Sequence, residues 1–192
     1  RRMSDSIDFT KPVFGGPETL GFDETFYTAG CSTDQQPFCF IANGKFLGME
    51  GATYRNPKGS WRSGMAAPVW DNATVDVRFT DGAVRFIAAT ETTPKQQQPR
   101  QPFFLYLPLS APHSPHLVPQ FAAGKSQAGV RGDMVWLVDQ CVGRVIAALE
   151  KHGLSKNTLL IVTSDNGPLI GSVKIGEREG TAQISNGHQS AG

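Results

Sequence analysis

The sequence has little of several features that mark particular classes of protein. Its 192 residues carry a formal net charge of +1, with 18 Lys and Arg against 17 Asp and Glu. A charge so close to neutral gives no sign of nucleic-acid binding or of electrostatic attachment to a membrane. No apolar run of the sequence approaches the roughly 18 residues that a membrane-spanning helix needs. Composition therefore indicates neither a nucleic-acid-binding protein nor a transmembrane segment.

Cysteine is also scarce. The three cysteines, Cys31, Cys39 and Cys141, follow no metal-binding spacing, and their odd number excludes a disulfide set that pairs them all. Cys141 falls on the apolar side of a predicted helix, where a buried and unreactive thiol is expected from the burial preference of cysteine. The cysteines therefore offer no metal site.

Glycine and proline, in contrast, are plentiful, with 21 Gly and 13 Pro, and they predict a chain rich in turns. Residues 1–73 in particular have few long periodic stretches. Within them, the apolar run 38–42 and the run 45–47 flank Asn43-Gly44, which predicts a short hairpin with a type I′ turn.

Two short apolar runs organise the second half of the chain. Phe103 to Leu109 leads to His113, and Thr158 to Thr163 leads to Asp165 and Asn166. Each run is too short for a free-standing helix, is rich in aromatic or β-branched residues, and ends in turn-forming residues. We interpret both as buried β-strands that carry chemistry at their carboxyl ends.

A long helix is predicted between these runs. Residues 132–152 repeat apolar side chains at the i, i+3, i+4, i+7 spacing of an amphipathic helix, and Gly153 can adopt the left-handed conformation that ends it. Strand, helix and strand form a βαβ unit, whose two strands are parallel with a right-handed crossover. A second helix is predicted from Thr80 to about Thr90, with Thr80 as its cap, followed by a polar connection with three prolines over 93–102.

Parallel strands bring their carboxyl ends to one edge of the sheet, where open α/β folds bind ligands. We therefore expect His113 to lie near Asp165 and Asn166. A carboxylate and an amide oxygen are hard ligands that suit Ca²⁺ or Mg²⁺, although Asp-Asn-Gly also forms an Asx turn without any metal. A histidine at such an edge can bond an anionic substrate or its leaving group, or can simply be satisfied by backbone.

The same residues carry a family resemblance. Residues 102–115, 132–135 and 154–168 resemble the corresponding segments of the arylsulfatases, which are type I sulfatases of the alkaline-phosphatase-like superfamily. The resemblance covers most of residues 7–192. It implies an α/β fold with a mixed, mainly parallel sheet flanked by helices.

The resemblance also implies hydrolysis of a sulfate monoester, on a small molecule or a carbohydrate. It assigns His113 to catalysis and to binding of the sulfate, ahead of the neighbouring His116. It assigns Asp165 and Asn166 to a Ca²⁺ ion, with further ligands from an upstream Asp-Asp pair that this sequence lacks. His188 lies in the segment 187–192, which resembles the segment just before the active-site lysine of the family, so we expect it near the substrate.

The nucleophile of this family is a formylglycine, made from the first residue of a Cys-or-Ser, x, Pro-or-Ala, x, Arg signature. No cysteine or serine of the sequence begins such a run. We therefore expect the nucleophile to lie outside this chain and the 192 residues alone to be inactive. We expect a partial catalytic domain, with a loop-rich substrate-facing region (1–73), an α/β core (74–168) and a final loop (169–192).

Two alternatives stay open. A phosphatase or phosphodiesterase of the same superfamily would share the sheet, but these enzymes typically pair Asp with His to hold zinc, whereas Asp165-Asn166 offers oxygen alone. A non-catalytic domain could instead use the scaffold to bind sulfated glycans. The resemblance is compatible with a periplasmic or secreted protein, although no residue marks a location. The sequence gives neither the substrate nor the oligomeric state.

Overall fold

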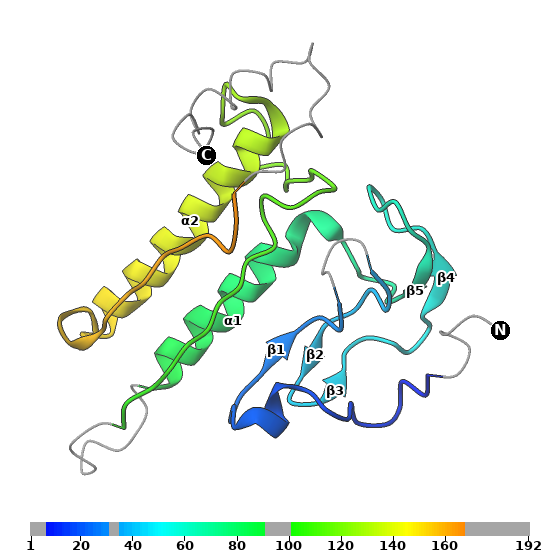
Figure 1. Ribbon diagram of the computed structural model, residues 1–192, viewed down its shortest axis with the longest axis horizontal. Helices are drawn as coiled ribbons and strands as arrows, with labels where there is room; N and C mark the ends of the chain where they lie inside the picture. The colour runs from blue at the N-terminus through cyan, green and yellow to red at the C-terminus, as the bar shows by residue number, and fades with distance from the viewer. Residues whose placement is uncertain (1–6, 31–34, 91–100, 168–192) are drawn as a thin grey trace.

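The computed structural model describes residues 7–30, 35–90 and 101–167. Two α-helices, α1 (Val75–Ala89) and α2 (Gly129–Lys151), lie side by side, and two small antiparallel sheets lie beyond α1 (Figure 1). The expected final loop and His188 fall outside the described residues. The division of the chain at residue 73 stays a prediction.

The first sheet contains three short strands, β1 (Phe26–Tyr27), β2 (Ile41–Ala42) and β3 (Lys45–Phe46), in that order. Asn43 and Gly44 join β2 to β3 with φ angles of 46° and 72°. Both angles are positive, as a type I′ turn requires, and the register pairs Ala42 with Lys45. The predicted hairpin is confirmed.

The second sheet pairs β4 (Thr53–Arg55) with β5 (Gly64–Ala66). An isolated bridge between Phe38 and Ala66 connects this sheet to the chain that leads into β2. The side chain of Arg55 donates to the backbone carbonyls of Ala67 and Trp70, at 2.9 and 3.5 Å. The loop that follows β5 is thereby held against β4.

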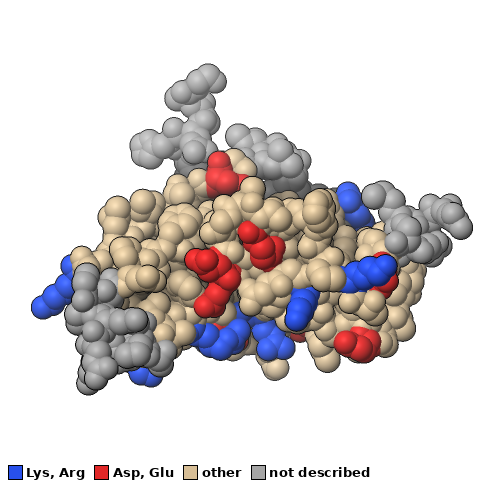
Figure 2. Space-filling model, turned by 90° about the horizontal axis from the view of Figure 1, so that it is seen from below, with Lys and Arg blue, Asp and Glu red and all other residues tan. Residues whose placement is uncertain are grey.

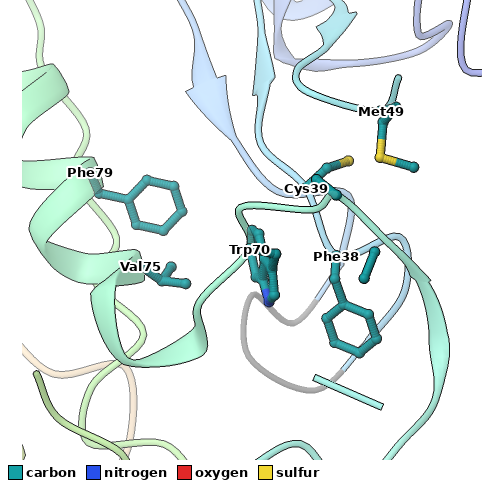
Figure 3. Close-up of a cluster of buried hydrophobic side chains, with 8 residues drawn as sticks. Phe38, Cys39, Met49, Trp70, Val75 and Phe79 are labelled. Carbon is teal, nitrogen blue, oxygen red and sulfur yellow. The ribbon is translucent and has the colours of Figure 1, made fainter. Parts of the chain in front are cut away.

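A buried aromatic cluster joins these sheets to the start of α1. Figure 3 shows Val75 and Phe79 projecting from the helix toward the loop that carries Trp70. Trp70 is 7% exposed, its ring centroid lies 5.0 Å from that of Phe40, and its indole N–H donates to Asn72 Oδ1 at 2.6 Å. The buried members of the cluster are Phe38, Cys39, Met49, Ala66, Ala67, Trp70, Val75 and Phe79.

Helix α1 begins earlier than the sequence predicted. Thr80 is not a cap: it is fully buried inside the helix, and its hydroxyl donates to the backbone carbonyl of Asp76 at 2.7 Å. The chain enters α1 through a 3₁₀ turn, Asn72–Thr74. The side chain of Asp71 caps this turn by accepting the backbone N–H of Ala73 at 3.0 Å. Asp71 is therefore the residue that marks the beginning of this helical segment.

Helix α2 agrees with its predicted span except that it begins at Gly129. Gly153 follows it with φ 64°, which is the left-handed ending expected at this position. Cys141 is 1% exposed on the face that contacts α1, so its predicted burial is confirmed. The helices also pack through a cluster formed by Ala83, Ile87, Val145, Ala148 and Leu149. In the described part of the chain, neither helix is apolar enough over sufficient length to cross a membrane.

The two runs predicted as strands are extended and run back along the helices in the same direction (Figure 1). Phe103, Leu105 and Leu107 pack on the cluster between the helices, whereas Phe104 and Tyr106 are 74% and 67% exposed. This alternation is the period of a strand. The helices and these extended runs together confirm the α/β class.

The parallel pairing expected between these runs is absent from the residues that the structure describes. Neither run forms a ladder there, and the strands that do pair are antiparallel. Leu159 and Ile161 of the second run are 86% and 73% exposed, so the prediction that this run is buried is wrong. A strand is defined by hydrogen bonds to a neighbour, so an apolar run can be recognised from its sequence while its partner cannot.

Charged side chains of both signs lie on one face of the described part of the chain. Figure 2 shows acidic and basic side chains interspersed on the face it presents. This agrees with the nearly neutral composition.

Candidate functional site

A broad open cleft follows the two extended runs and the helices behind them. His113 lines it just after the first run, and Asp165 and Asn166 line it just after the second run. All three side chains are exposed. His113 and the adjacent pair Asp165 and Asn166, more than fifty positions apart in the sequence, therefore line the same cleft, while their chemical roles stay predictions.

His113 sits in a tight turn at the end of the first run. Its backbone N–H donates to the carbonyl of Ser110 at 2.9 Å, and its side-chain Nδ1 contacts the carbonyl of Ser114. A carbonyl only accepts, so Nδ1 carries the proton in the neutral ring and Nε2 has the lone pair. Pro112 and Pro115, on either side, both follow cis peptide bonds.

Asp76, in the first turn of α1, holds the backbone just before His113. Its Oδ1 accepts the N–H of Ser110 at 2.6 Å, and its Oδ2 accepts the N–H of Ala111 at 3.0 Å. The residue is 6% exposed, and this burial raises the pKa of its carboxyl, whereas the two backbone N–H groups act to lower it. Sequence reasoning missed Asp76, although an acid between the core positions Val75 and Phe79 was a signal of a buried polar contact.

Asp133 on α2 also accepts two backbone N–H groups, at the far end of the loop that follows His113. It is 5% exposed, and its carboxylate accepts the N–H groups of Gly124 and Ser126 at 2.8 and 2.7 Å. Two buried carboxylates on two helices therefore hold the loop that carries His113 and His116.

Asp165 and Asn166 form a local network of hydrogen bonds. Asp165 Oδ1 accepts the backbone N–H of Asn166 at 2.8 Å, and Asn166 Nδ2 donates to the carbonyl of Gly167 at 2.8 Å. The hydroxyl of Ser164 donates to the carbonyl of Asn166 at 2.6 Å. These bonds join neighbouring residues, so they are not the Asx turn expected as the alternative to a metal site, and they do not use Asp165 Oδ2 or Asn166 Oδ1.

The donor chemistry of this pair fits a hard cation. A carboxylate and an amide oxygen are ligands that Ca²⁺ accepts, but Ca²⁺ takes about 6–8 oxygens. Among residues 7–30, 35–90 and 101–167, no group of three or more His, Cys, Asp and Glu side chains is placed to hold a metal. Asp165 and Asn166 would therefore supply part of a coordination shell.

The other histidines differ in position. His116 is half-buried and lines the same cleft. His152 follows the last residue of α2 and also lines this broad cleft, and its backbone N–H donates to the carbonyl of Ala148 at 3.1 Å. His188 lies outside the described residues, so its expected place near the substrate stays a prediction.

The described cysteines are poor nucleophiles. Cys39 and Cys141 are both 1% exposed. Burial raises the pKa of the Cys39 thiol to about 12, and burial likewise raises the pKa of Cys141. Because the thiolate is the reactive form, neither residue is suited to attack an ester at neutral pH.

Comparison with known proteins places this arrangement in context. An N-acetylgalactosamine-6-O-sulfatase of Bacteroides thetaiotaomicron is 26% identical over 96% of this chain, which corresponds to 41% of that protein. An N-acetylgalactosamine-6-sulfatase of Rattus norvegicus is 41% identical over 45% of this chain and 17% of its own length. A rat steryl-sulfatase is 41% identical over 41% of this chain and 14% of its own length.

A solved structure agrees with the sequence matches. It comes from work on the metabolism of multiple glycosaminoglycans by Bacteroides thetaiotaomicron, and it superimposes with a TM-score of 0.69 at 25% identity, over 86% of this chain and 40% of the other. The chain thus spans less than half the length of these relatives. The family model named Sulfatase matches residues 11–190, and the chain therefore belongs to the sulfatase family.

Proposed function

We propose that this chain supplies part of the active site of a sulfuric ester hydrolase, which cleaves sulfate monoesters in the complete protein. The observation that carries the proposal is the cleft shared by His113, Asp165 and Asn166, in a chain whose match to the sulfatase family covers residues 11–190. The cleft combines a titratable group with hard oxygen ligands, as a reaction on an anionic ester requires.

His113 is the proposed contact to the sulfate or to its leaving group. With Nδ1 directed to the carbonyl of Ser114, Nε2 is the nitrogen that would meet the substrate. In its protonated form Nε2 donates to an ester oxygen, and in its neutral form it accepts a proton. The turn closed by Ser110 holds the backbone of His113, which lines the cleft.

Asp165 and Asn166 are the proposed ligands of a Ca²⁺ ion. When bound, the ion would polarise the sulfate oxygens and offset their charge. Asp165 Oδ2 and Asn166 Oδ1 are the atoms proposed for this role, since the other polar atoms of these side chains are engaged in hydrogen bonds with neighbouring residues. The remaining ligands would come from other parts of the complete protein.

The proposed nucleophile, a formylglycine, would lie outside these residues, because no cysteine or serine here begins the signature that the resemblance implies. The high pKa of Cys39 and the burial of Cys141 support this proposal, since both argue against a nucleophile among the described cysteines. The role of this chain would then be to bind and orient the ester rather than to attack it.

Sulfated carbohydrate is the proposed substrate class. The relative matched over 96% of this chain is named an N-acetylgalactosamine-6-O-sulfatase, whereas the steryl-sulfatase match covers 41%. The test is to incubate the complete protein, with Ca²⁺, with N-acetylgalactosamine 6-sulfate, an aryl sulfate and the matching aryl phosphate. We expect sulfate release from the first two and a much slower release of phosphate.

Two results would favour the alternative functions. Faster cleavage of the aryl phosphate would identify a phosphatase or phosphodiesterase. Binding of a sulfated glycan without turnover, by protein shown to hold Ca²⁺ and to carry the formylglycine modification, would identify a non-catalytic glycan-binding protein.

A further inference from the structure

We propose that Asp76 is a positioning residue that fixes His113 relative to helix α1. This inference rests on the proposed function, because it assigns a role to the backbone behind the proposed sulfate-binding histidine. Nothing in the family match assigns Asp76 a role.

The geometry of the contact is specific. Both carboxylate oxygens of Asp76 are used, one for the N–H of Ser110 at 2.6 Å and one for the N–H of Ala111 at 3.0 Å. The hydroxyl of Ser110 bonds the same carboxylate. Hydrogen bonds to an ionised acceptor are roughly twice as strong as neutral ones, and burial shields these bonds from water.

Asp76 is itself held in place. Its backbone carbonyl accepts the hydroxyl of Thr80 at 2.7 Å and contacts the thiol of Cys141 at 3.9 Å. Thr80 is 0% exposed and Cys141 is 1% exposed, so the platform includes both helices. The carboxylate therefore projects from a rigid, buried part of the fold.

The link from Asp76 to His113 runs through a single residue, Ser110. Asp76 accepts the N–H of Ser110, and the carbonyl of Ser110 accepts the N–H of His113 at 2.9 Å. The turn between them is thus fixed at its first residue and closed at its last. A misplacement of about 1 Å can reduce catalysis about 10²-fold, so the placement of this turn matters if His113 acts on the ester.

Asp133 supplies an internal comparison. It is as buried as Asp76 and also accepts two backbone N–H groups, but these belong to Gly124 and Ser126, eleven or more residues after His113. A purely structural role would make the two aspartates equivalent, whereas a positioning role would make Asp76 matter more for turnover.

The test compares Asp76→Asn with Asp133→Asn in the complete protein, loaded with Ca²⁺. Each substitution replaces one acceptor oxygen by an NH₂ group that faces a backbone N–H. We expect D76N to lower kcat for an aryl sulfate by about tenfold or more with KM nearly unchanged, because the loop loses a hydrogen bond to a charged acceptor. We expect D133N, assayed well below its Tm, to keep kcat within about threefold.

Amide hydrogen exchange provides a readout that does not depend on activity. In the wild type we expect the Ser110 and Ala111 amides to be protected, and in D76N to exchange at least about tenfold faster while helix α1 stays protected. If D76N does not fold, the protection of these two amides in the wild type decides whether the proposal stands. Unprotected amides in the wild type would overturn the proposal.

Two kinetic outcomes would also overturn it: kcat of D76N within about threefold of wild type, or equal losses of kcat in D76N and D133N. If the wild type hydrolyses no sulfate ester, the proposed function fails, and amide exchange alone then decides whether Asp76 positions this turn.

Discussion

Arg144 on α2 and Asp81 on α1 form an ion pair, with 2.6 Å between Nη2 and Oδ1. The pair bridges the two helices at the surface, where the side chains are 44% and 32% exposed. Between the helices, Ile87 is fully buried among residues of both. The helix pair is thus joined by two kinds of contact whose expected contributions to stability differ.

Removal of the buried contact should cost far more than removal of the ion pair. We expect Ile87→Ala to lower the free energy of unfolding by about 2–5 kcal/mol, because it deletes buried carbon and leaves a cavity. Arg144→Ala should cost less than about 1 kcal/mol, because water and salt screen an exposed pair. Denaturant unfolding of both variants measures the difference, and equal losses would contradict this account of the helix pair.

Alkaline pH should destabilise the protein in part through Cys39. The folded state holds the thiol proton up to a pKa of about 12, against an ordinary value of 9.0. Between these values the unfolded state binds fewer protons than the folded state, so the free energy of unfolding falls as pH rises above about 9. Melting temperatures at pH 7–11 should therefore fall more steeply for wild type than for Cys39→Ala. Parallel curves for the two proteins would contradict the claim that the buried Cys39 thiol contributes to this loss of stability.

His113→Ala should reduce the kcat of the complete protein on a sulfate ester by about 10²–10⁴-fold, the range found for loss of a general acid or base. His152→Ala is the matched control, because His152 ends α2 and has no proposed role in the reaction. Equal rates for wild type and His113→Ala would remove this histidine from the mechanism.

Calcium content should depend on Asp165 and Asn166. We expect Asp165→Ala and Asn166→Ala to lower the Ca²⁺ bound per protein molecule, measured by elemental analysis, and to lower turnover with it, because each deletes an oxygen ligand. Asp139→Ala, at an exposed position on α2, is the control. Full calcium content in both site variants would place the metal elsewhere.

The elements predicted correctly from the sequence are those with a local cause. The turn at Asn43 and Gly44 needs two residues that tolerate positive φ, and helix α2 is marked by apolar spacing and by Gly153. The start of α1 was missed because Thr80, a residue type that often caps helices, here bonds back to the carbonyl of Asp76 inside the helix.

Contacts between residues far apart in the sequence were harder to predict. Asp76 meets Ser110 across 34 positions, and no local pattern predicts which loop a buried acid will hold. The extended run from Phe103 was recognised by its composition, but its partner strand could not be. His113 and Asp165 line one cleft, but the parallel pairing from which the βαβ pattern predicted their proximity is absent from the described residues, so that prediction is not tested by a shared sheet edge.

Sulfate release by the complete, Ca²⁺-loaded protein tests the central claim most directly. We predict that an aryl sulfate is hydrolysed, that chelation of Ca²⁺ lowers the rate, and that His113→Ala lowers it in protein that retains its calcium. Hydrolysis that is unaffected by both changes would show that the cleft of His113, Asp165 and Asn166 is not the reaction site.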